Sequence, residues 1–294
     1  MNETTSQQHQ RPVPSGAQPE ASDNPLLDFA ALPRFTAFDP SQVAPALDVL
    51  IAQAREALEQ VTDESVPLTW DDFVEPLDEA TERLARAWGI VGHLNAVADT
   101  PSLREAYNAN LPRVTQFWTE LSQHEALFAR YKAFAAQPEF AQLSAPRRRT
   151  VENALRDFRL GGAELVSPAR ERFAEIQERH AALSQKFSEN VLDATNAFSL
   201  YIDDESRLDG LPADAREAAR EAAQADGRDG WKFTLQFPSY LPVMQYANDR
   251  SLRETVYRAY ATRASELAAA PADADERAAL DNAAVIDELL ALRA

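Results

Sequence analysis

The feature that most constrains this chain is a long stripe of mainly apolar residues after Ser167-Pro168. Its members are spaced alternately three and four apart, which is the repeat of one helix face. They are Phe173, Ile176, His180, Leu183, Phe187, Val191, Ala194 and Phe198. A helix of about seven turns with such a stripe needs neighbours to pack against. The sequence therefore predicts a fold built on long amphipathic helices.

Earlier parts of the chain repeat this pattern behind helix-start signals. Asp39-Pro40, Thr69, Thr100-Pro101 and Ser144 each precede a stripe with helical spacing. Side-chain caps and first-turn prolines are typical of helix N-termini. With only 8 Gly among 294 residues, few positions interrupt the helical pattern. The segment "HEALF", residues 124–128, is expected on the same helical run as the stripe that follows Thr100-Pro101.

The period changes near residue 231. In "WKFTLQF", residues 231–237, apolar and polar side chains alternate, which predicts a half-buried strand. Its expected partner is "FSLYID", residues 198–203, in an antiparallel pair. We expect the two prolines of "FPSYLPVM" to close the strand. The predicted fold class is mainly α, with helical lobes and this small β element.

Composition excludes several function classes. The 29 Lys+Arg and 47 Asp+Glu give a net charge of −18, which argues against nucleic acid or an anionic membrane as partner. The chain has no Cys, so disulfides and thiolate chemistry are ruled out. Residues 1–23 lack the cationic start and apolar core of a secretory signal, and we expect them to form a disordered tail. Since no run approaches the ~20 apolar residues of a membrane span, we expect a soluble, cytoplasmic protein.

The histidines offer weak metal-ligand candidates. "HEALF" matches part of the zinc-protease motif His-Glu-x-x-His, but Phe128 stands where the second His would be. His124 is therefore expected to be structural, and His9 lies in the tail. A packing role is favoured for His93, and a hydrogen-bonded core position for His180. There is no nucleophile elbow and no glycine loop for phosphate. We predict no catalytic residue and no metal ligand in this chain.

A family resemblance extends over most of the sequence. The segments "NPLLDF", "HLNAV", "LREAYNANLP", "NALRDFRL", "FSENVLDAT", "PSYLPVMQYANDRSLRETVYRAYATRAS" and "IDELLALR" occur in this order between Asn24 and Ala294. Together they resemble the N-terminal part of the oligopeptidase A family. Thimet oligopeptidase and neurolysin are members of the same group of zinc metallopeptidases, which cut short peptides.

The resemblance implies a partial two-lobed architecture with a channel between the lobes. Residues 24–160 would belong to the first lobe and residues 161–294 to the second, with a break near Gly161-Gly162. The intact family enzyme uses zinc, whose ligands follow the last segment that resembles this chain. The apolar helical stripe at the C-terminus is what a truncated chain would show, although a docked C-terminal helix would show the same pattern. No zinc is therefore expected to bind this chain, and we predict that it is inactive alone.

Two functional hypotheses remain open from the sequence. The first is the channel-forming portion of a peptidase that acts on short peptides, with a separate C-terminal catalytic portion as a candidate partner. Tyr240 is then the candidate substrate-binding residue, because the predicted strand edge beside it could pair with a peptide backbone. Alternatively, the predicted strand pair only contributes to the packing of a lobe and contacts no peptide. The second hypothesis is a non-catalytic helical module that binds peptides or a partner protein.

Overall fold

The computed structural model describes residues 24–294, so the predicted tail at residues 1–23 lies outside the described residues. Contacts divide the chain into a first unit that ends at Leu165 and a second unit, Val166–Ala294. The assignment of residues 24–160 and 161–294 to the two lobes of a peptidase stays a prediction. Among residues 24–294, no helix combines the length and apolar character needed to cross a bilayer.

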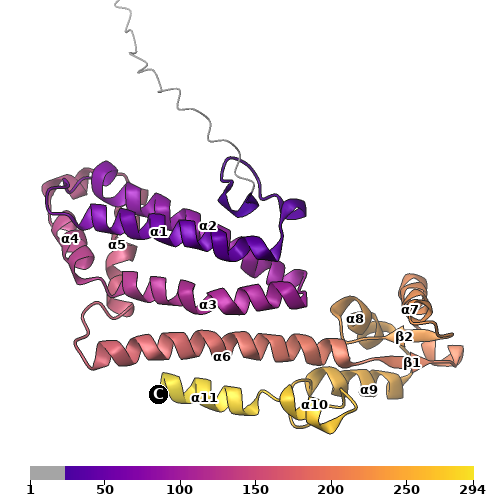
Figure 1. The fold of residues 1–294 in the computed structure, drawn as a ribbon. Helices are drawn as coiled ribbons and strands as arrows, with labels where there is room; N and C mark the ends of the chain where they lie inside the picture. Colours follow the sequence, from indigo (N-terminus) through magenta and orange to yellow (C-terminus); the bar gives the residue numbers. More distant parts are fainter. Residues whose placement is uncertain (1–23) are drawn as a thin grey trace, which may run out of the picture. The chain divides into compact units, whose positions relative to one another are not determined.

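The first unit is helical (Figure 1). Its main helices are α1 (Val43–Thr62), α2 (Glu75–Val97), α3 (Pro101–Ser122), α4 (Glu125–Ala135) and α5 (Ala145–Leu160). Short helical turns accompany them: η1 (Pro25–Leu27), η2 (Phe35–Ala37), η3 (Pro40–Gln42), η4 (Trp70–Val74) and η5 (Pro138–Gln142). Helix α1 packs most extensively on α2 and also contacts α3 and α4.

Side-chain caps set several of these helix starts, as the sequence predicts. Asp39 accepts a hydrogen bond from the Ser41 backbone N–H at 2.9 Å, while its own N–H donates to the Gln42 side chain at 2.8 Å. This reciprocal pair satisfies two backbone donors at the turn that leads into α1. Thr69 caps η4 by accepting from the Asp72 N–H at 3.0 Å, and α2 continues from that turn.

The sequence predicted that "HEALF" continues the helical run that begins after Thr100, and this prediction is wrong. Helix α3 passes through Pro112 without interruption and ends at Ser122. Gln123 and His124 then leave helical geometry, and α4 begins at Glu125. The segment "HEALF" therefore starts a new helix, because the His124 side chain caps the exposed N-terminus of α4.

The second unit contains helices and the small sheet. Its elements are α6 (Ala169–Ala197), β1 (Leu200–Ile202), η6 (Glu205–Leu208), α7 (Ala213–Ala225), β2 (Trp231–Phe233), α8 (Phe237–Tyr246), α9 (Arg250–Ala261), α10 (Ala274–Ala279) and α11 (Ala283–Arg293). The core of this unit gathers Phe233, Leu235, Val243, Leu252 and Val256 from β2, α8, α9 and the segment between β2 and α8.

The predicted antiparallel pairing is confirmed, but both strands are shorter than expected. Leu200 lies opposite Phe233 and Ile202 opposite Trp231, in strands of three residues each. The predicted strand 231–237 ends early because the Thr234 N–H donates to Ser239 Oγ at 2.9 Å, which turns the chain into α8. Pro238 lies in the first turn of α8, where its missing N–H has no cost.

Helix α11 lies alongside α6 (Figure 1), and a buried amide pair joins the two elements. The Asn190 side-chain amide donates to Asn282 Oδ1 at 2.9 Å, and Asn282 Nδ2 donates to the Phe187 carbonyl at 3.1 Å. Asn190 and Asn282 are 6% and 2% exposed. Since buried amides are costly when unpaired, these bonds favour one register of the two helices.

The substitution Asn282→Ala should destabilise the second unit. It leaves the Asn190 amide and the Phe187 carbonyl without their partner, so the free energy of unfolding should fall by about 1–3 kcal/mol. Urea unfolding followed by circular dichroism measures this. The control is Asn196→Ala, on an exposed position of α6, which should change the free energy by less than about 0.5 kcal/mol. Equal effects of the two substitutions would contradict the assignment.

Candidate functional site

The partial zinc-protease motif forms a helix cap. His124 Nδ1 accepts a hydrogen bond from the Leu127 backbone N–H at 3.1 Å. Phe128, which stands at the position of the second motif histidine, is 3% exposed and packs on Phe158 with a ring-centroid distance of 5.4 Å. The prediction that "HEALF" is structural agrees with this geometry.

The other two described histidines belong to different units. His93 is exposed on α2, and its ring contacts Phe35 at a centroid distance of 5.9 Å. His180 is half-buried, and its Nε2 lies 2.9 Å from Arg293 Nη2. It is hydrogen-bonded as expected, but it does not reach the core. His9 lies outside the described residues.

The zinc of the family does not fit the described part of this chain. Within residues 24–294, no three His, Asp or Glu side chains lie close enough together to hold a metal ion. A catalytic zinc site needs about three such protein ligands and an open position. No chemical step through a metal can therefore be built from these residues.

Tyr240 belongs to a group of tyrosines on α8 and α9. Its ring stacks on Tyr260 with a centroid distance of 4.1 Å and an interplanar angle of 22°. The Arg263 guanidinium lies over the Tyr260 ring at 3.8 Å from its centroid. Partial burial raises the pKa of the Tyr240 hydroxyl, and the nearby Tyr260 and Tyr257 add to the increase. We call Tyr240, Tyr257 and Tyr260 the tyrosine cluster.

Exposed aromatic side chains accompany the tyrosine cluster on α8 and α9. Tyr257 is 55% exposed, and Phe237 on α8 is 59% exposed. Phe237 lies one helical turn before Tyr240 on the same face of α8. Aromatic rings with a polar tip present contact area at a low cost in side-chain entropy, as is common in protein interfaces. The sequence predicted that Tyr240 follows a strand edge, whereas the structure places it on a helix.

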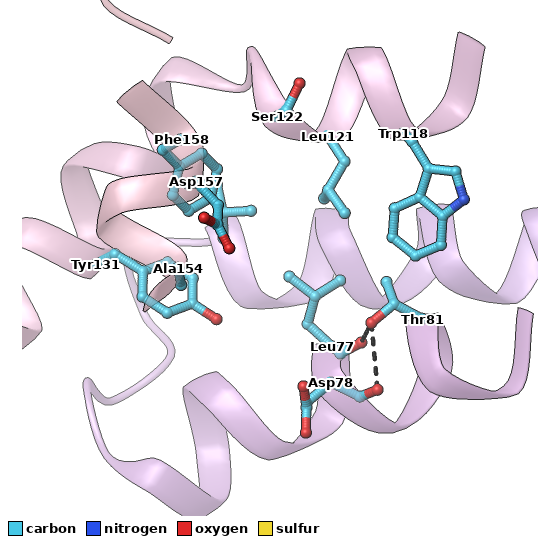
Figure 2. Close-up of a pocket in the computed structure, with 11 residues that line it drawn as sticks. Leu77, Asp78, Thr81, Trp118, Leu121, Ser122, Tyr131, Ala154, Asp157 and Phe158 are labelled. Carbon is cyan, nitrogen blue, oxygen red and sulfur yellow. Dashed lines mark hydrogen bonds between the residues drawn. The ribbon is translucent and has the colours of Figure 1, made fainter. Parts of the chain in front are cut away.

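A pocket in the first unit was not found by sequence reasoning. It has a volume of about 310 Å³ and lies among α2, α3, α4 and α5. Its lining consists of Leu77, Asp78, Thr81, Trp118, Leu121, Ser122, Leu127, Tyr131, Ala154, Asp157 and Phe158. Figure 2 shows the Tyr131 hydroxyl and the Asp157 carboxylate directed towards the middle of the pocket. The lining residues come from four separate helices, so no local motif signals the pocket.

Two acidic groups of the pocket have raised pKa values. Burial raises the pKa of the Asp78 carboxyl, and the negative charge of Glu82 raises it further. Burial is also the main reason that the pKa of the Tyr131 hydroxyl is raised, with the Asp78 carboxylate adding to it. The pocket thus places a carboxyl group beside a phenol whose hydroxyl is held in its neutral form.

The chain is similar in sequence to known proteins over most of its length. Residues 47–184 match the family model described as Neurolysin/Thimet oligopeptidase, N-terminal domain. Oligopeptidase A of Haemophilus influenzae is 43% identical over 270 residues, covering 92% of this chain and 39% of that protein. Oligopeptidase A of Escherichia coli is 39% identical over the same shares. The probable cytosolic oligopeptidase A of Arabidopsis thaliana is 39% identical over 92% of this chain and 38% of its own length.

The chain belongs to the oligopeptidase A and thimet oligopeptidase family of peptidases. Within this family it corresponds to the N-terminal region. It spans about two fifths of the length of the curated relatives that it matches.

Replacement of the His124 cap should destabilise the first unit. His124→Ala leaves the Leu127 N–H without its acceptor and should lower the free energy of unfolding by about 0.5–2 kcal/mol. His124→Asn supplies another good capping acceptor and should restore most of the loss. Thermal unfolding of the three proteins measures this order. A metal ligand would behave differently, because Asn would then be as damaging as Ala.

Proposed function

We propose that this chain is the N-terminal, channel-forming portion of an oligopeptidase A-like zinc metalloendopeptidase that degrades short peptides. The observation that carries the proposal is the similarity to oligopeptidase A proteins over 92% of the chain. The intact enzyme would use zinc held by residues outside the matched region. Alone, residues 24–294 would supply binding surface without the groups that activate water.

Tyr240 is proposed as a residue that contacts the peptide substrate. Its stacking on Tyr260 fixes the ring on one side, which reduces the entropy lost when a substrate binds. The exposed Phe237 and Tyr257 extend the same aromatic surface. An extended peptide would lay its side chains against these rings. Short peptides would thus be one partner, and a C-terminal catalytic portion would be another.

A cytoplasmic location and partners other than nucleic acid or anionic lipid are also part of this proposal. A net charge of −18 disfavours nucleic acid and anionic lipid as partners. One relative is named as a probable cytosolic protein and another as an organellar one. We place this chain with the cytosolic group.

A second candidate function is that of a non-catalytic module that binds peptides or a partner protein. The exposed aromatic rings of α8 and α9 favour it, because such residues often anchor interfaces. A module of this kind would bind a labelled peptide mixture saturably at micromolar concentrations. A portion that needs the rest of the enzyme would show no saturation in the same titration.

The purified 294-residue chain should not cleave short peptides. It should also contain far less than one zinc per chain, because its described residues form no ligand set. Elemental analysis and a fluorogenic peptide assay with and without chelator test both points. Stoichiometric zinc together with chelator-sensitive cleavage would overturn the proposal.

Tyr240 can be tested in a chimera in which this chain replaces the matching segment of the Haemophilus influenzae oligopeptidase A. Tyr240→Ala should raise KM for short peptides about three- to tenfold with little change in kcat, since it removes ground-state binding. Tyr246→Ala is the control. Tyr246 is 51% exposed on the same helix, but its six-residue offset places it on another face. Equal KM values for the two variants would argue against a substrate contact at Tyr240.

A further inference from the structure

We propose that the pocket among α2, α3, α4 and α5 binds a small organic cation, namely an ammonium or guanidinium group carried by an apolar body. The pocket lies in the first unit, whereas the tyrosine cluster lies in the second. The inference is therefore independent of the function proposed for Tyr240.

The walls of the pocket suit the apolar body of such a ligand. Leu77, Leu121 and Leu127 line it together with the rings of Trp118 and Phe158. A volume of about 310 Å³ is at the small end of ligand sites. In Figure 2 the Trp118 ring and the Tyr131 ring lie at opposite ends of the pocket. A ring or short alkyl chain would be covered on several sides.

Among the three hydroxyl groups that line the pocket, that of Tyr131 is the one without a hydrogen-bond partner in the described residues. The residue is only 7% exposed, and its hydroxyl makes no hydrogen bond within residues 24–294. The other two lining hydroxyls are already used: Thr81 Oγ1 donates to the Leu77 carbonyl at 2.7 Å, and Ser122 Oγ donates to the Thr119 carbonyl at 3.0 Å. Because this hydroxyl is directed into the pocket (Figure 2), a ligand can bond to it in place of water. A ligand N–H group would give the phenol oxygen a donor.

The charges of the pocket select a cation. Asp78 is an exposed residue of the pocket lining whose carboxylate has no ion-pair or hydrogen-bond partner within residues 24–294. It is close enough to Tyr131 to raise the pKa of the Tyr131 hydroxyl. Asp157 also lines the pocket, although Arg156 pairs with it at 2.7 Å. Together these groups would stabilise an ammonium and repel a carboxylate.

The test is a titration of the full chain with phenethylammonium at neutral pH. Binding is followed by calorimetry and by the fluorescence of Trp118, which Trp118→Phe identifies among the 4 Trp of the chain. We expect saturation with a Kd below about 1 mM. The uncharged 2-phenylethanol should bind about tenfold more weakly, because it lacks the charge-assisted contact. The anionic 3-phenylpropionate should not bind measurably.

Two variants and a matched control identify the residues. Asp78→Asn should weaken phenethylammonium binding about tenfold or more, and Tyr131→Phe about threefold or more. Glu75→Gln removes the same charge from the first turn of the same helix, away from the pocket lining, and should leave the affinity unchanged. Circular dichroism spectra should coincide for all proteins.

Three results would overturn the inference. They are an absence of saturable binding, equal affinities for phenethylammonium and 2-phenylethanol, and equal losses from Asp78→Asn and Glu75→Gln. None of these bears on peptide cleavage or on Tyr240, so the two proposals stand or fall separately.

Discussion

The first unit depends on the continuous apolar face of α1. Leu47 and Leu50 near the start of this helix enter a core with α2 and α3, while Leu58 and Val61 near its end enter a second core with α2, α4 and α5. One straight helix thus joins two apolar clusters, and its neighbours must be arranged to cover both. The pocket borders the second cluster, where four helices converge around Tyr131.

In the second unit, the contact between α6 and α11 depends on a polar pair as well as on apolar packing. The stripe of α6 is only partly buried, with Leu183 and Ala194 inside and Phe187 36% exposed. Because apolar contacts tolerate sliding, they select a register weakly. The Asn190–Asn282 pair selects it strongly, since any shift of α11 would leave buried amides without partners. Packing thus holds the two helices together, and hydrogen bonds determine where they meet.

The helices could be predicted from the sequence because their determinants are local. Asp39, Thr69 and Thr100 cap helices as their side chains suggest. The end of β2 could not be predicted, because alternation continues to Phe237 while the Ser239 hydroxyl turns the backbone after Phe233. The break before α4 was missed because histidine is an uncommon cap. The pocket was missed because Asp78, Tyr131 and Asp157 meet only through the packing of separate helices.

The overall charge does not explain cation selectivity at the pocket. A net charge of −18 raises the concentration of every cation near the surface, but salt screens charges beyond about 8–10 Å. Only the carboxylates at the pocket act at short range, and Asp157 is partly neutralised by Arg156. Small inorganic cations also remain strongly hydrated, so apolar walls offer them little. An organic cation gains from both the walls and Asp78, and this combination favours it over a metal ion at the same site.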